Sequence, residues 1–187
     1  MLRRHAFLTL PARPSATIMA QVLLKARDAP LQLRRMPRRK PEPVPEINEQ
    51  YTNFKLQIKP SKIHRWGVYA AEDIPARRKI MEYTGERISR KETRRRSEEQ
   101  GRMIYLFTLD NYWTLDGAVG GSGAQYINHC CDPNIRTVIQ KGHILYYSSR
   151  AIKKGEELTV DYHFAKDIEE VPCKCGAAKC RGTINLK

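Results

Sequence analysis

Seven consecutive residues, Asn-His-Cys-Cys-Asp-Pro-Asn at positions 128–134, constrain the fold of this chain more than any other stretch. Proline restricts the residue before it, so Asp132-Pro133 favours an extended or turn geometry that displays the polar groups on a bend. Apolar, strand-like runs flank this bend at 124–127 and 135–139. We therefore expect the bend to be buried, and buried polar groups need hydrogen-bond partners. The segment is either a polar turn that satisfies itself or part of a site completed elsewhere in the chain.

Two distant stretches favour a shared site. They are Gly-Glu-Glu-Leu-Thr-Val-Asp-Tyr at 155–162 and a Cys-x-Cys-x4-Cys pattern at 173–180. Together with Ile-His-Arg-Trp-Gly-Val-Tyr-Ala at 63–70, they resemble the motifs of the SET-domain protein-lysine methyltransferases. The ending Cys-Arg-Gly-Thr-Ile-Asn is most similar to the trithorax or mixed-lineage-leukaemia branch. The resemblance runs from about Lys55 to the C-terminus, and four motifs in order make it specific.

Charge and proline content separate the N-terminal quarter from the rest. Residues 1–45 contain ten basic residues, two acidic residues and seven of the 11 prolines, a composition that resists forming a core. We expect a basic, proline-rich, disordered tail at 1–48, a SET catalytic domain at 52–164 and a post-SET segment at 165–187. Such a tail either contacts nucleic acid or remains solvated without a partner. The first 27 residues lack acids, which leaves open a transit peptide or a start at Met19.

Hydropathy and cysteine spacing bear on the compartment. No apolar run approaches the roughly 20 residues that a membrane span requires, so no membrane association is expected. The five cysteines lie between 130 and 180, and their odd number and metal-like spacing argue against a disulfide framework. We therefore expect a reducing, intracellular location. The resemblance implies the nucleus and chromatin in a host with histones, and otherwise the cytoplasm.

The pattern of apolar residues predicts a mainly β domain with few helices. Apolar side chains alternate at 54, 56 and 58, which is typical of a half-buried strand. Further short strands are expected at 68–71, 80–83, 144–148 and 158–162, with a hairpin formed by 104–109 and 112–115. Ser89 and Glu92 form a capping-box sequence that predicts a polar surface helix ending at Gly101. The resemblance implies a SET fold of several small sheets in which the segments around Asn128 and Leu158 cross in a pseudoknot.

The cysteines of the C-terminal pattern predict a zinc site. Three thiolates leave a tetrahedral zinc ion one ligand short. The resemblance supplies Cys131 as the fourth ligand, beside Cys173, Cys175 and Cys180. A structural Zn2+ ion there would staple the post-SET tail to the bend, and its binding free energy would count as folding free energy. The alternative is a group of buried free cysteines; Cys130 is expected to be a packed residue and not a ligand.

The resemblance also implies S-adenosyl-L-methionine as the cofactor and assigns residues to the site. Tyr162 matches the essential tyrosine that orients the lysine amine, and Tyr105 matches a tyrosine that lines the lysine channel. The residues that match cofactor contacts are Arg65, Trp66, Tyr69, Tyr126, Asn128 and His129. Arg65 replaces the first glycine of the common Gly-Trp-Gly motif, which is costly if the backbone φ there is positive.

Val160 bears on how many methyl groups are added. It occupies the x position of Leu-Thr-x-Asp-Tyr, which faces the substrate channel in the family. Tyrosine there tends to limit methylation, and phenylalanine tends to permit more. Valine is smaller than either, which predicts more than one methylation unless another tyrosine, such as Tyr105 or Tyr147, fills the space.

Together these residues predict an S-adenosylmethionine-dependent protein-lysine N-methyltransferase that acts on a histone or histone-like tail, with accessory subunits as in relatives of this branch. A non-histone protein is the alternative substrate, because substrate choice depends on groove shape. A catalytically weak chromatin- or nucleic-acid-binding module is the rival from another class. A decayed site should have lost Tyr162, Asn128 or His129, and none is lost.

Overall fold

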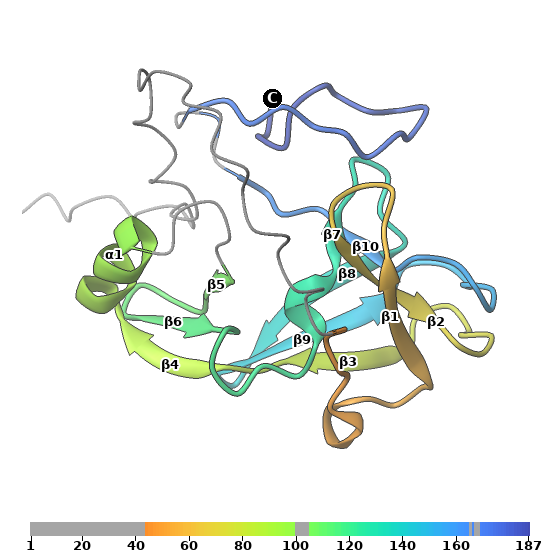
Figure 1. The fold of residues 1–187 in the computed structure, drawn as a ribbon, viewed down its shortest axis with the longest axis horizontal. Coiled ribbons are helices and arrows are strands. Elements are labelled where there is room, and N and C mark those ends of the chain that lie inside the picture. Colours follow the sequence, from red (N-terminus) through yellow and green to blue (C-terminus); the bar gives the residue numbers. More distant parts are fainter. Residues whose placement is uncertain (1–43, 100–104, 165, 167–168) are drawn as a thin grey trace, which may run out of the picture.

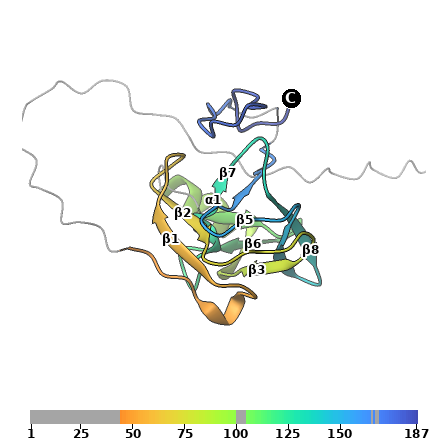
Figure 2. The same ribbon diagram turned by 90° about the vertical axis from the view of Figure 1, so that its right-hand side faces the viewer.

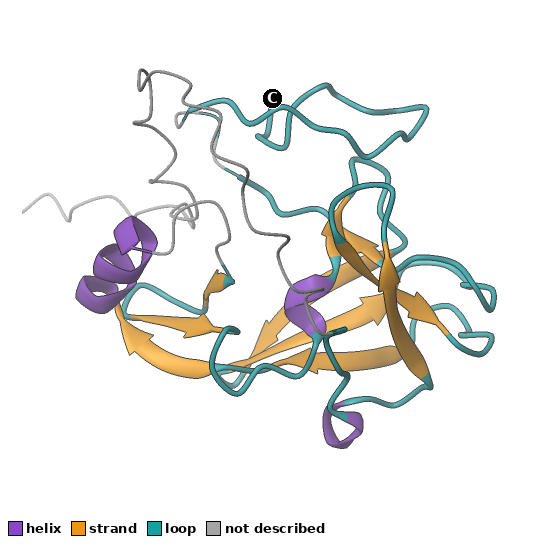
Figure 3. Cartoon of the chain, in the orientation of Figure 1, coloured by secondary structure: helices purple, strands orange, loops and turns teal. Residues whose placement is uncertain are grey.

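A computed structural model of the chain describes residues 44–99, 105–164, 166 and 169–187 (Figure 1). The expected N-terminal tail lies almost wholly outside the described residues, and so does Gly101, the expected end of the helix. Within the described residues strands dominate and helices are few, as the sequence predicted (Figure 3). No helix among them is both long and apolar enough to cross a membrane.

The strands are short and are joined by turns and loops. In chain order they are β1 (Leu56–Pro60), β2 (Trp66–Ala70), β3 (Lys79–Tyr83), β4 (Glu86–Ser89), β5 (Leu106–Thr108), β6 (Trp113–Asp116), β7 (Asn128–His129), β8 (Ile135–Gln140), β9 (His143–Ser148) and β10 (Thr159–Val160). The helices are α1 (Arg90–Glu99) and two single turns of 3-10 helix, η1 (Glu49–Tyr51) and η2 (Ala124–Tyr126).

These strands form several small sheets, as expected. The β4-β6-β5 sheet lies beside α1, the β3-β9-β8 sheet runs through the middle of the molecule, and β1 pairs with β2 on the far side (Figure 1). The remaining sheet is the parallel pair of β7 and β10, with Thr159 opposite Asn128 and Val160 opposite His129. This pairing brings together the two motifs that the sequence analysis expected to cross.

Local sequence explains α1 and the hairpin of β5 and β6. The Ser89 hydroxyl accepts a hydrogen bond from the Glu92 amide at 3.3 Å, so the predicted cap is present. The Glu92 carboxylate binds Arg95 and Arg96 one turn later, which suits a surface helix that is polar all round. In the hairpin, the Asp110 carboxylate accepts from two backbone amides of the turn, each at 2.8 Å.

The apolar core lies around the central sheet and fixes the position of β10. Its largest fully buried apolar side chains are Ile74, Ile80, Met81, Ile135, Ile144, Ile152, Leu158 and Val68. Because Leu158 is fully buried, the residues that follow it enter β10 in one register only.

Two expectations about strands were wrong. Residues 124–127 do not form a strand: Gly123 has a φ of 96°, which turns the chain, and the Ile127 amide donates to the Ala124 carbonyl at 3.1 Å to close η2. The strand expected at 158–162 is reduced to β10, because Asp161 and Tyr162 leave the ladder and bind other partners.

The C-terminal segment, 169–187, lies as an irregular coil above β7 in both views (Figure 1, Figure 2). Isolated bridges join Pro172 to Thr183 and Phe164 to Asn185. The Asn185 amide oxygen accepts from the Val171 amide at 2.9 Å, and the Thr183 hydroxyl donates to the Val171 carbonyl at 3.1 Å. Because a coil this short buries few apolar side chains, polar contacts must hold it in place.

Candidate functional site

Asn128, on β7, sits at the centre of the site. It is 6% exposed, and its side-chain nitrogen donates to the Trp66 carbonyl at 2.9 Å and to Glu157 Oε1 at 2.8 Å. A longer contact of 3.4 Å reaches the His64 carbonyl. All three partners are acceptors, which fixes the orientation of the amide. Its oxygen has no hydrogen-bond partner among the described residues and is therefore available to a bound donor.

Glu157 is a site residue that the sequence analysis missed. Its carboxylate accepts from Asn128, from the Ser61 hydroxyl at 2.8 Å and from the Tyr69 hydroxyl at 3.0 Å. Gly67 permits this approach, because a Cβ there would lie 2.4 Å from Glu157 Oε1. The adjacent Glu156 instead pairs with Arg150. Two neighbouring glutamates therefore bind different partners, and an isolated bridge to Tyr69 places Glu157 at the site.

The residues expected to contact the cofactor from the 63–70 motif lie at the start of β2. Arg65 has a φ of 40°, so the condition under which an arginine is costly there is met. Trp66 and Tyr69 are half-buried, and burial together with the Glu157 charge raises the pKa of Tyr69. The structure therefore brings this motif next to Asn128.

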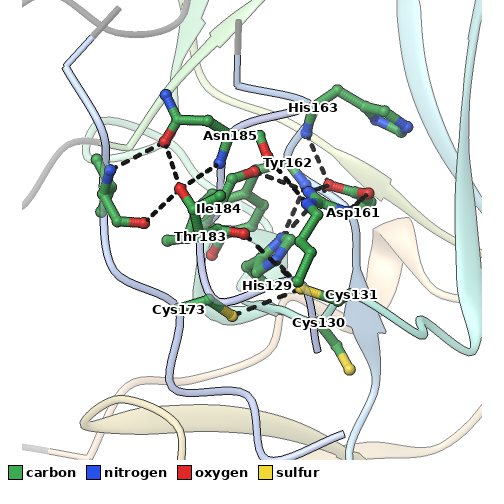
Figure 4. A network of polar contacts seen from close by, with 12 residues as sticks. His129, Cys130, Cys131, Asp161, Tyr162, His163, Cys173, Thr183, Ile184 and Asn185 are labelled. Carbon is green, nitrogen blue, oxygen red and sulfur yellow. Dashed lines mark hydrogen bonds and ion pairs between the residues drawn. The ribbon is translucent and has the colours of Figure 1, made fainter. Parts of the chain in front are cut away.

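His129 joins two parts of the site (Figure 4). Its Nδ1 accepts a hydrogen bond from the Tyr162 amide at 3.2 Å, and its Nε2 lies 3.4 Å from the Cys131 sulfur. Burial lowers the pKa of His129 to about 4, although the nearby Asp161 charge opposes this. The ring is therefore neutral near pH 7. Because Nδ1 accepts, the proton is on Nε2 and points at the sulfur.

Tyr162 follows β10 and turns its hydroxyl toward η2. The hydroxyl donates to the Ile127 carbonyl at 2.8 Å, and the ring packs against His129 and Phe164. Burial raises the pKa of Tyr162, and the charges of Tyr105 and Glu157 raise it further. The residue is therefore a protonated phenol at neutral pH, with lone pairs on its oxygen still able to accept a hydrogen bond.

Tyr162 packs against a core that holds or contacts several other aromatic side chains. Tyr105 and Tyr126 meet edge to face, with ring centroids 5.6 Å apart. The Tyr83 hydroxyl donates to the Tyr105 carbonyl, and the Tyr83 ring packs against Phe107 at 5.3 Å. Val160 is 2% exposed and belongs to the core beside these rings. The expected channel residues Tyr105 and Val160 thus lie in one apolar, aromatic region with Tyr162.

Four cysteines form a cluster with the geometry of a metal site. Their sulfur atoms all lie within 4.8 Å of one another: Cys131, Cys173, Cys175 and Cys180. The Cys131 sulfur is 3.7 Å from that of Cys173 and 3.9 Å from that of Cys180. A tetrahedral zinc ion with Zn–S bonds of about 2.3 Å places its sulfurs about 3.8 Å apart. The four thiols therefore fit a structural zinc ion.

The thiols of the cluster differ in how readily they ionise, because burial raises the pKa of Cys131 and of Cys173. Burial opposes ionisation of Cys175, but hydrogen bonds from the amides of Cys131 and Ala177 and from neighbouring thiols lower its pKa to about 6. Cys130 lies outside the cluster of four and is 7% exposed. Its sulfur accepts from the Asp132 amide at 3.4 Å, and burial raises the pKa of its thiol.

Arg181 and Asp161 connect this cluster to Tyr162, and the sequence analysis gave no role to Arg181. The Asp161 carboxylate accepts from the Arg181 guanidinium and from the His163 amide. Burial disfavours its charged form, but these hydrogen bonds outweigh burial and lower the pKa of Asp161. The signal for Arg181 was present in the sequence, since it immediately follows a cluster cysteine, but its partner could be found only in three dimensions.

Comparison with known proteins places these residues in a wider context. A family model of the SET domain matches residues 65–163. The histone-lysine N-methyltransferase trithorax of Drosophila melanogaster is 35% identical over 146 residues, which are 74% of this chain and 4% of that protein. A histone-lysine N-methyltransferase of Saccharomyces cerevisiae, described as H3 lysine-4 specific, is 40% identical over 136 residues, 67% of this chain and 13% of that protein. The human histone-lysine N-methyltransferase 2D is 41% identical over 134 residues, 67% of this chain and 2% of that protein.

The chain thus spans only 2% to 13% of the length of these relatives.

Proposed function

The chain belongs to the SET-domain family, and on that premise we propose that it is an S-adenosylmethionine-dependent protein-lysine N-methyltransferase that acts on a histone or histone-like tail. The resemblance predicted from its motifs, including the trithorax branch, is confirmed by the comparisons. The observation that carries the proposal is that the pairing of β7 with β10 brings together a half-buried, protonated Tyr162, which follows β10, and an Asn128 amide oxygen without a partner among the described residues.

The residues around Asn128 suit a cationic cofactor. When bound, S-adenosylmethionine supplies a methyl group on a positively charged sulfur, and it also carries an ammonium group. The Asn128 oxygen, which no described residue hydrogen-bonds, is an acceptor suited to an ammonium. The Glu157 carboxylate, 2.8 Å from the Asn128 nitrogen, adds negative charge that favours a cation nearby. The other proposed cofactor contacts are Arg65, Trp66, Tyr69, Tyr126 and His129.

The region around Tyr162 suits a lysine side chain. A free lysine amine has a pKa near 10.4, and only the neutral amine is a nucleophile. An apolar, aromatic channel disfavours the charged amine, as does a neighbouring cation. We assign Tyr162 the role of orienting the amine: its hydroxyl proton is held by the Ile127 carbonyl, which leaves its oxygen to accept an amine N–H. Tyr105 and Val160 line the channel in this proposal.

The cysteine cluster serves a structural purpose in the proposal. Zinc held by Cys131, Cys173, Cys175 and Cys180 would fix the C-terminal segment beside the site. Free energy of zinc binding then stabilises a coil that has little apolar burial.

The substrate proposal rests on the relatives. The protein of Saccharomyces cerevisiae is described as specific for lysine-4 of histone H3, and we propose a histone H3 tail as the first substrate to test. A histone substrate would place the protein at chromatin in the nucleus. A non-histone protein substrate with cytoplasmic location is the alternative, and accessory subunits are proposed as in the branch.

Transfer of a labelled methyl group tests the proposal. The purified chain is incubated with methyl-labelled S-adenosylmethionine and mixed core histones, followed by an array of lysine-containing peptides. Label in histone H3 supports the full proposal, and label only in non-histone peptides supports the alternative substrate. A chain that binds cofactor and zinc but labels neither would favour a chromatin-binding module without catalysis.

We also propose that segment 1–45 contacts nucleic acid through its basic residues, since the segment carries a net charge of +8. Removing them should weaken binding to DNA or RNA and reduce its salt dependence. Equal binding with and without 1–45 would contradict this part of the proposal.

A further inference from the structure

Tyr146, on β9, carries a buried hydroxyl that has no hydrogen-bond partner among the described residues. The residue is 2% exposed and lies opposite Met81 on one neighbouring strand and Thr137 on the other. The described residues provide no hydrogen bond to its hydroxyl. Buried polar groups are rarely left in this state, and those that are often face a water molecule or a ligand.

The strand turns Tyr146 toward the aromatic region of the site. Successive side chains on a strand point to opposite faces, and the next residue, Tyr147, lies under the Arg136 guanidinium on the other face at 5.2 Å. The Tyr146 ring meets Tyr83 edge to face at 6.5 Å, and the Tyr83 hydroxyl is held by the Tyr105 carbonyl. Tyr83 therefore links Tyr146, through its ring, to the backbone of the expected channel residue Tyr105, through its hydroxyl.

Tyr146 belongs to the buried cluster against which Tyr162 packs. Burial raises the pKa of Tyr146, and the charge of an ionised Tyr162 raises it further. Burial also raises the pKa of Tyr83, and the charges of Tyr146 and Tyr162 raise it further. Val160 and Tyr146 belong to the same buried cluster, and β10 lies against β8, the partner of β9.

We propose that Tyr146 is a specificity-determining residue of the lysine channel. Its hydroxyl fills, from β9, the space that Val160 leaves on β10, and it hydrogen-bonds the lysine amine or a water molecule beside it. This inference rests on the proposed function and deepens it. The structure turns Tyr147 away from this space, so of the tyrosines not already in the channel it is Tyr146 that fills it.

This role of Tyr146 reverses the product predicted from Val160 alone, which was lysine carrying more than one methyl group. A first methyl group removes one N–H from the amine, and a second must take the space of the water or of the Tyr146 hydroxyl. The hydroxyl therefore favours the unmodified amine over the methylated one as a substrate. We expect the chain to produce mainly monomethyl-lysine.

Mass spectrometry of a histone H3 N-terminal peptide, with S-adenosylmethionine in excess, tests the inference. Tyr146→Phe should raise the ratio of dimethyl- to monomethyl-lysine about tenfold, the effect of losing one hydrogen bond. The matched control Tyr147→Phe should leave the ratio unchanged. Val160→Tyr, added to Tyr146→Phe, should return the ratio toward that of the unmodified chain, because it replaces the hydroxyl from β10.

Unchanged ratios in an active Tyr146→Phe enzyme overturn the inference and leave the proposed function standing. No transfer by any of these folded chains overturns the proposed function and the inference with it. Thermal unfolding gives a readout that needs no turnover. Because the hydroxyl has no partner among the described residues, Tyr146→Phe should keep the melting temperature or raise it, and a fall of more than about 2 °C would reveal a structural hydrogen bond and overturn the inference.

Discussion

Arg181 donates two hydrogen bonds to the carboxylate of Asp161, at 2.7 and 2.8 Å, and thereby joins the residue after Cys180 to the residue before Tyr162. The two side chains are only 17% and 14% exposed. The same guanidinium donates to the carbonyls of Ile184 and Asn185, so it also organises the C-terminal coil. The cysteine cluster and Tyr162 are therefore parts of one polar network, closed on its other side by His129 (Figure 4).

Arg181→Lys should loosen this network while keeping the positive charge. Lysine cannot donate in a planar fork to both carboxylate oxygens and also reach two carbonyls. We expect a loss of about 1–3 kcal/mol in the free energy of unfolding, measured by chemical denaturation. Arg150→Lys is the control, because its pair with Glu156 is 57% exposed on the arginine side and should contribute little. Equal losses in the two variants would show that Arg181 is no more than a surface cation.

The sequence predicted the motifs of the site, but it did not predict all of the residues that hold them. Asn128, Tyr162 and the cysteines belong to spaced patterns, so their residue types alone indicated their chemistry. Glu157 and Tyr146 lie in runs where a neighbour of the same type, Glu156 or Tyr147, was an equal candidate. Which of the two faces inward is decided by strand register and packing, and this information is absent from a local pattern.

The strand expected at 124–127 shows a second limit. Apolar residue types there agreed equally with a strand or with a buried turn of helix. The left-handed conformation at Gly123 decided the outcome, because it redirects the chain just before Ala124. The fold class was nevertheless predictable, since the alternating pattern of β1 and the cap at Ser89 both appear in the structure.

Cys131→Ser should remove the metal from the chain. The Cys131 sulfur lies within 4 Å of those of Cys173 and Cys180, and a serine hydroxyl is a poor zinc ligand. We expect about one zinc ion per unmodified chain and much less than one in the variant, measured by elemental analysis. Limited proteolysis should then cleave 169–187 faster.

Cys130→Ser is the matched control for this change. Its sulfur contacts the Asp132 backbone and lies outside the cluster of four, so zinc content should stay the same. Loss of zinc in this variant, with zinc retained in Cys131→Ser, would mean that the ligand assignment is wrong.

Arg65→Gly should relieve backbone strain at the start of β2. The φ of 40° at this position is adopted readily only by glycine. Arg65→Ala is the comparison. Both variants lack the arginine side chain, so the difference in stability between them reports the backbone effect. We expect the glycine variant to be more stable than the alanine variant by about 1 kcal/mol in chemical denaturation. Equal stability of the two would show that the turn carries no strain.

Glu157→Gln should weaken cofactor binding through Asn128. The carboxylate oxygens accept from three side chains, and an amide nitrogen in place of one oxygen cannot accept. At least one donor loses its partner, and we expect about tenfold weaker binding of S-adenosylmethionine by calorimetry. Glu156→Gln, whose partner is Arg150 on the surface, should bind the cofactor as the unmodified chain does. Weakening in both variants alike would argue for a general charge effect.

Tyr162→Phe should abolish methyl transfer while preserving the fold and cofactor binding. The change removes one oxygen and keeps the ring that packs against His129 and Phe164. The Ile127 carbonyl loses its donor, which should cost about 1–2 kcal/mol of stability. Loss of an oriented hydroxyl should lower turnover of a histone H3 peptide by at least about 100-fold.

Tyr112→Phe, at a residue 75% exposed, is the control and should change neither stability nor turnover. Calorimetry with S-adenosylmethionine and a labelled-methyl assay separate binding from turnover, and near-normal turnover in Tyr162→Phe would falsify the role assigned to its hydroxyl.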